Sequence, residues 1–123
     1  MFQKIEDSNW VDITTVQLDE LVQKNDAVFV DITADWCATC QFNKVNVINS
    51  NKIVQLFKDN QVTLLRADWT RPNQKINTFL ENYDRFGIPF NAFFSKNYPE
   101  GILLSELLSA KEIVSTLNKI NND

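Results

Sequence analysis

Cys37 and Cys40 are the residues of this chain best suited to chemistry, because they are its only cysteines and form a C-x-x-C motif. The chain contains no histidine. Ser-His-Asp and Cys-His catalysis need an imidazole base, and a four-coordinate zinc site needs more ligands than two thiolates, so these classes are excluded. Carboxylate chemistry and thiol chemistry remain.

The spacing of the two cysteines suits dithiol-disulfide exchange. A three-residue step brings both thiols to one face of a helix, close enough for a disulfide. Cys37 is expected at the helix N-terminus, where free amides and the helix dipole stabilise a thiolate, and Cys40 one turn deeper. An exposed attacking thiol followed by a buried resolving thiol is what exchange requires.

Two other interpretations of the motif stay open: a pair of buried structural thiols, or ligands of one soft metal ion. A copper-carrying motif would gain from a nearby methionine, and the only methionine is Met1. The motif follows an apolar strand directly and opens a helix, and this context favours redox chemistry.

Three further residues near the motif are candidates for the site. Asp31 lies inside the apolar run VFVDIT, where burial favours the protonated acid and a proton could pass to or from Cys40. A polar residue on a partly solvated sheet face is the alternative interpretation. Asp35 is expected nearer the surface, shaping the local potential, and Trp36 either forms a docking surface or packs in the core.

The elements that position these residues alternate between strand and helix. Strands are expected at 27–33, 61–69 and 90–95, the last followed by a hairpin through NYPEG. Helices are expected at about 14–24 with Thr14 as N-cap, from near 37 to 49, from Ser50 onward, after Pro72, and at 109–120 with Ser109 as N-cap. This order predicts an α/β fold whose first two strands are parallel and adjacent.

The composition narrows the class of protein. A chain of 123 residues suits one domain, and a net charge of -4 without basic clusters argues against binding to nucleic acid. No apolar stretch approaches the roughly 18 residues needed to span a bilayer, and the first ten residues lack an apolar signal core. We expect a cytoplasmic protein or a soluble part of a longer one.

The strand-to-helix junction VDITADWC, the C-x-x-C motif and GIP before the next strand together resemble the thioredoxin superfamily. Within it, the closer likeness is to the C-terminal periplasmic domain of DsbD/ScsB-type thiol:disulfide interchange proteins. It is carried by VFVDITADWCATC, LLRADWT, FGIPFNAFF and LSELLSAKEIVSTL, in the same order. The resemblance covers about residues 27–120. It implies a thioredoxin-like fold, with a central mixed β-sheet flanked by helices at 14–123, after an N-terminal extension at 1–13.

The resemblance also implies a function. The chain would be a monomeric protein-disulfide reductase domain, periplasmic and part of a membrane-anchored protein, that takes electrons from a membrane-embedded domain and reduces periplasmic partners. Cys37 would be the nucleophile, Cys40 the resolving thiol and Asp31 the buried acid, with no metal and no cofactor beyond the redox-active pair. Pro89 would be cis, although a proline before a strand is also an ordinary edge device. The Ile88 backbone would face the disulfide and pair with a docked partner strand.

Two alternative functions remain: a general cytoplasmic thioredoxin-like reductase, and a thioredoxin-fold interaction module whose cysteines do not turn over. Ordinary thioredoxins carry Gly-Pro between the cysteines, where this chain carries Ala38-Thr39. The DsbD-type family tends to have a Glu four residues after the second cysteine, where this chain has Lys44. A cation on the helix face of the two thiols predicts a more acidic Cys37 than a carboxylate there would give.

Overall fold

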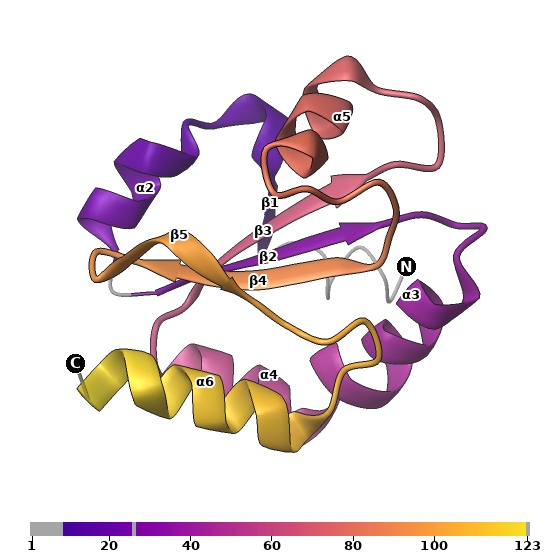
Figure 1. Cartoon of the computed structure of the whole chain (residues 1–123). Coiled ribbons are helices and arrows are strands. Elements are labelled where there is room, and N and C mark those ends of the chain that lie inside the picture. Colours follow the sequence, from indigo (N-terminus) through magenta and orange to yellow (C-terminus); the bar gives the residue numbers. More distant parts are fainter. Residues whose placement is uncertain (1–8, 26, 123) are drawn as a thin grey trace.

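The computed structural model of the chain describes residues 9–25 and 27–122. Its strands form one five-stranded mixed sheet in the order β1-β3-β2-β4-β5 (Figure 1). The strands are β1 (Trp10–Asp12), β2 (Val28–Thr33), β3 (Thr63–Asp68), β4 (Phe90–Ser95) and β5 (Tyr98–Leu103). β1 and β2 flank β3 in parallel, β4 is antiparallel to β2, and β5 is antiparallel to β4. The predicted α/β fold is confirmed, and so is the parallel pairing of the first two predicted strands.

Helices cover both faces of this sheet, as Figure 1 shows. One face carries α2 (Leu18–Lys24) and α5 (Gln74–Glu81), and the other carries α3 (Ala38–Asn43), α4 (Asn51–Asp59) and α6 (Ala110–Asn122). A π-helical segment, η2 (Lys44–Ile48), continues α3. Across residues 9–25 and 27–122, no helix is long and apolar enough to cross a membrane.

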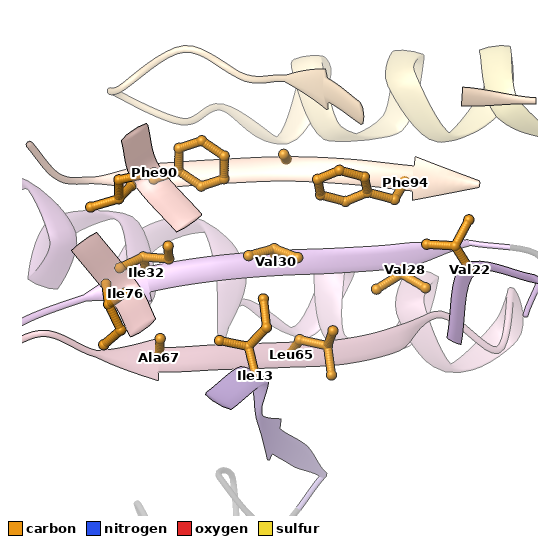
Figure 2. Packing of buried hydrophobic residues seen from close by; sticks show 12 residues of the cluster. Ile13, Val22, Val28, Val30, Ile32, Leu65, Ala67, Ile76, Phe90 and Phe94 are labelled. Atoms are coloured by element: carbon orange, nitrogen blue, oxygen red, sulfur yellow. The ribbon is translucent and has the colours of Figure 1, made fainter. Parts of the chain in front are cut away.

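The central strands β2 and β4 are buried along their whole length, because each is covered by helices on both faces. Val28, Val30 and Ile32 of β2 face the core beneath α2 and α5 (Figure 2). Phe29 points the other way and packs against Phe57 of α4. Since side chains alternate along a strand, Asp31 lies on the same face as Phe29, the face covered by α3, α4 and α6.

The first helix begins later than the sequence predicted. The chain makes a short 3-10 turn, η1 (Ile13–Thr15), and α2 begins only at Leu18. The carboxylate of Asp12 accepts hydrogen bonds from the Thr14 N–H at 2.9 Å and from its hydroxyl at 2.8 Å. Thr14 is therefore engaged inside a turn that Asp12 caps, and the prediction of Thr14 as the helix N-cap is wrong.

Strand β1 was not predicted from the sequence. Its three residues fall within positions 1–13, assigned to an N-terminal extension, and they pair with Leu64, Leu65 and Arg66 of β3. A three-residue strand is too short for an alternating pattern to reveal.

The other predicted helix starts are confirmed. Ser50 accepts the Ile53 N–H at the start of α4, after a break at Asn49, and Ser109 accepts the Glu112 N–H at the start of α6. The Glu112 carboxylate does not close a capping box with Ser109. It accepts instead from the backbone N–H of Ser105 at 3.0 Å and from its hydroxyl at 3.1 Å, which holds the loop that leads into α6.

Candidate active site

Cys37 and Cys40 form a disulfide at the junction of β2 and α3. Cys37 is the N-cap residue of α3, and its sulfur accepts the Cys40 N–H at 3.2 Å. Cys37 is 7% exposed and Cys40 2% exposed, so the predicted order of accessibility is present although both residues are largely covered. Ala34 and Ile88 pack against the pair. Cys37 is therefore the more accessible residue of the pair.

The loop between β2 and α3 is fixed by hydrogen bonds rather than by packing alone. The Ala34 carbonyl accepts from the Cys37 N–H at 3.2 Å and from the Gln41 side-chain amide at 2.8 Å. These two contacts tie the end of the strand to the first turn of the helix that carries both cysteines.

Thr70, in the loop after β3, also holds the loop between β2 and α3 in place. Its hydroxyl accepts the Asp35 N–H at 2.9 Å and donates to the Asp68 carboxylate. Its carbonyl accepts the Trp36 indole N–H at 3.2 Å. The Trp36 ring is 63% exposed, which excludes the alternative of core packing, and Asp35 is exposed as predicted. Trp36 is thus an oriented aromatic surface directly before Cys37.

Asp31 is buried as predicted, at 2% exposure, but it does not stand alone. Arg66 of β3 donates from Nε to its Oδ2 at 3.0 Å, forming an ion pair. Asn91 of β4 donates from Nδ2 to its Oδ1 at 2.8 Å. The three residues face one another in the sheet register, so they form a polar row across β3, β2 and β4. The guanidinium of Arg66 also stacks on the Trp10 ring, 3.9 Å from its centroid.

The loop before β4 brings a third element to the disulfide. The Ile88–Pro89 peptide bond is cis, and Ile88 packs against the cysteine pair. Pro89 itself is buried. Upstream in this loop, the Phe86 ring is 83% exposed, the most exposed of the large apolar side chains in the described part of the chain. Phe86 was missed from the sequence, where the available signal was a phenylalanine directly before Gly-Ile-Pro.

Lys44 lies where α3 passes into the π-helical segment, half-buried, with its N–H bonded to the Cys40 carbonyl. The residue before it, Asn43, was missed from the sequence and is 1% exposed. Asn43 donates to the Glu106 carbonyl at 2.8 Å and accepts the Leu108 N–H at 3.0 Å. These bonds fasten the loop between β5 and α6 to the side of α3 (Figure 1).

The comparisons with known proteins agree with this geometry. A family model described as thioredoxin-like matches residues 9–96. The chain belongs to the thioredoxin-like family and has a thioredoxin fold with a Cys37–Cys40 disulfide.

Its curated relatives include the thiol:disulfide interchange proteins DsbD of Pasteurella multocida, 24% identical over 110 residues, and of Pectobacterium atrosepticum, 29% identical over 104 residues. These alignments cover 86% and 82% of this chain but only 19% and 18% of the relatives, so the chain spans about a fifth of their length. Among solved structures, the oxidised C-terminal domain of Neisseria meningitidis DsbD superposes with a TM-score of 0.67. It is 18% identical, and the match covers 83% of this chain and 88% of that one. The predicted thioredoxin-like fold and the resemblance to DsbD are confirmed.

The Asp31–Arg66 pair gives a testable prediction about stability. Arg66→Met leaves a buried carboxylate without its cation, and we expect a loss of about 3 kcal/mol in the free energy of unfolding. Adding Asp31→Asn removes the charge that needed pairing, so the double variant should recover more than half of that loss. Urea unfolding of the wild type, the single variants and the double variant measures the coupling.

Arg71→Met, which removes an exposed arginine from the loop after β3, is the matched control and should change the stability by less than about 0.5 kcal/mol. Additive losses in the double variant would contradict an ion pair that stabilises the sheet.

Proposed function

We propose that this chain is a protein-disulfide reductase that passes two electrons from the reduced Cys37–Cys40 pair to the disulfide of a partner protein. The observation that carries the proposal is the position of the pair, with Cys37 as the more exposed cysteine at the N-cap of α3 and Ile88, next to cis-Pro89, packed against it. No group other than the two thiols is needed to hold the electrons.

The reaction balances with these atoms alone. The Cys37 thiolate attacks one sulfur of the partner disulfide, the mixed disulfide forms, and the other partner sulfur leaves as a thiolate that takes a proton. Cys40 then loses its proton and attacks Cys37, the Cys37–Cys40 bond forms, and the second partner thiolate leaves. The deep position of Cys40 suits this intramolecular second step, since it keeps Cys40 from competing for the partner.

The partners are proposed from the likeness to DsbD. The donor would be a membrane-embedded domain and the acceptors periplasmic proteins, with this chain as a monomeric periplasmic domain of a membrane-anchored protein. A general cytoplasmic thioredoxin-like reductase, and an interaction module without turnover, are the alternatives. Reduction of the chain by a purified membrane donor domain, but not by cytoplasmic thioredoxin reductase, would separate the first proposal from the cytoplasmic one.

Insulin reduction tests the chemistry. With dithiothreitol as donor, we expect the wild-type chain to accelerate precipitation of the insulin B chain, and Cys37→Ser to abolish that acceleration. Cys40→Ser should accumulate a mixed disulfide through Cys37, visible as a mass increase that a reductant removes. A wild-type chain as inactive as Cys37→Ser, with the donor competent, would support the interaction module instead.

Lys44 is proposed to make Cys37 more acidic. In a Cys40→Ser background, the pH midpoint of Cys37 alkylation by iodoacetamide should move to higher pH in Lys44→Glu, by on the order of half a pH unit. The matched control is Lys52→Glu, an exposed position on α4, which carries the same charge reversal away from the motif. If the Lys44→Glu curve coincides with that of its parent, Lys44 has no such role.

Phe86 and Trp36 are proposed as the aromatic docking surface around the disulfide. Phe86→Ser should raise KM for insulin about five- to tenfold with little change in kcat, because truncating an exposed aromatic anchor removes binding area and leaves the thiols in place. Reduction of a small aromatic disulfide should not change, since it does not span the docking surface. Val54→Ser on α4 is the control for loss of an exposed apolar side chain. An equal loss on both substrates would point to damage at the disulfide itself.

A further inference from the structure

Asn91 is the uncharged partner of Asp31 in the polar row. It lies on β4, two positions after Pro89, directly opposite Asp31, and is 3% exposed. Its Nδ2 donates to Asp31 Oδ1 at 2.8 Å and lies 3.4 Å from the Val30 carbonyl. Its own Oδ1 has no hydrogen-bond partner within the described part of the chain. A buried acceptor without a donor is unfavourable, so packing alone does not account for the free oxygen of this amide.

The charged groups around Asp31 are few and can be named. Arg66 of β3 contacts Asp31 Oδ2, which leaves Oδ1 to Asn91. Among the helices that cover this face, α3 carries Cys40 and has Cys37 as its N-cap, and Lys44 follows Cys40 by one turn. The side chains that α4 and α6 bury carry no charge: they are the apolar Ile53, Phe57, Ile113, Leu117 and Ile120, and the neutral Thr116. A proton that reaches Asp31 Oδ1 therefore meets the Asn91 amide.

We propose that Asn91 is a positioning residue that supports Asp31 in both of its protonation states. With Asp31 ionised, Asn91 Nδ2 donates to the carboxylate, as in the structure. When Asp31 is protonated at Oδ1, a half-turn of the Asn91 amide about its Cβ–Cγ bond presents Oδ1, which accepts the new O–H. The unpartnered oxygen is the acceptor for that second state.

This role rests on the proposed function and deepens it. In the proposed resolving step, Cys40 of α3 gives its proton to the Asp31 carboxylate, on the sheet face that α3, α4 and α6 cover. The Cys40 thiolate then attacks Cys37, and the partner thiolate leaves and takes a proton from water. Asp31 then returns its proton to water. Every electron moves between sulfur atoms, and Asn91 acts only through Asp31.

The first test is the titration of the Asp31 carboxyl group in the reduced chain, followed by carboxyl ¹³C NMR. Asn91→Leu removes the hydrogen bond to the ionised Asp31 and the one proposed for the protonated acid. The bond to the carboxylate is charge-assisted and is the stronger of the two, so the midpoint of the Asp31 titration should rise by roughly 0.5 to 1 pH unit. Ser95→Ala is the matched control, because Ser95 is also buried on the same face of β4 without contact to Asp31. Equal midpoints in the wild type and Asn91→Leu would overturn the proposal.

The second test needs no variant and stands even if Asn91→Leu fails to fold. In the wild-type chain, the ¹H and ¹⁵N shifts of the Asn91 side-chain amide should change with pH at the same midpoint as the Asp31 carboxyl. Side-chain shifts that stay constant while Asp31 titrates would overturn the switch from donor to acceptor.

A kinetic readout separates this proposal from the reductase proposal. Reduced chain mixed with an aromatic disulfide releases one thiolate when Cys37 attacks and a second when Cys40 resolves. In Asn91→Leu, the pH profile of the second release should move to higher pH while the first is unchanged; coincident second-release profiles would contradict the role of Asn91. If the Asp31 carboxyl and the Asn91 amide titrate together in a chain that does not reduce insulin, the Asn91 proposal stands and the reductase proposal is rejected.

Discussion

The interaction on which the arrangement of the site depends is the ion pair between Asp31 and Arg66 at the centre of the sheet. A carboxylate in a fully covered strand is costly to bury unless it is paired and hydrogen-bonded, and here the two neighbouring strands supply both partners, Arg66 from β3 and Asn91 from β4. The pair is satisfied only in the observed register, because a shift by one residue would turn Arg66 to the opposite face. The polar row therefore specifies how β3, β2 and β4 align, and this alignment sets where the loops around the disulfide emerge.

The loops at the strand ends connect this alignment of the sheet to the two cysteines. Because β2 and β3 are parallel, their C-terminal loops meet at one edge, and Thr70 joins them through bonds to Asp35 and Trp36. The antiparallel β4 begins at the same edge, which brings Ile88 against the cysteines. Each contact depends on the strand pairing rather than on sequence neighbours. A rigid sheet thus holds three loops around one disulfide with little conformational freedom left to lose when a partner binds.

The sequence predicted the features that local patterns determine. The apolar runs of β2 and β4, the serine caps of α4 and α6, and the C-x-x-C motif at a strand-to-helix junction all carry signals within a few residues. The predicted start of the first helix at Thr14 was wrong because Asp12 offered a competing local cap. Other features were missed because they depend on register and on contacts about 35 to 65 residues apart along the chain. They are strand β1, the partners Arg66 and Asn91 of Asp31, and the bonds of Asn43 to the loop before α6. An arginine inside the apolar run of β3 was the one available hint that Asp31 has a partner.

The burial of the disulfide sets what a partner must do. With Cys37 only 7% exposed, little of the disulfide is open to a reacting sulfur, so the partner has to be aligned closely before exchange can begin. Under the proposed function, an extended segment would meet this requirement by laying its backbone along the loop that carries Ile88. Its neighbouring side chains would rest on two exposed aromatic residues, Trp36 directly before Cys37 and Phe86 two residues before Ile88. The aromatic rings then provide affinity, the backbone provides alignment, and the thiols alone provide reactivity. Selectivity among disulfides of similar potential follows from how well each can present such a segment, rather than from the redox pair itself.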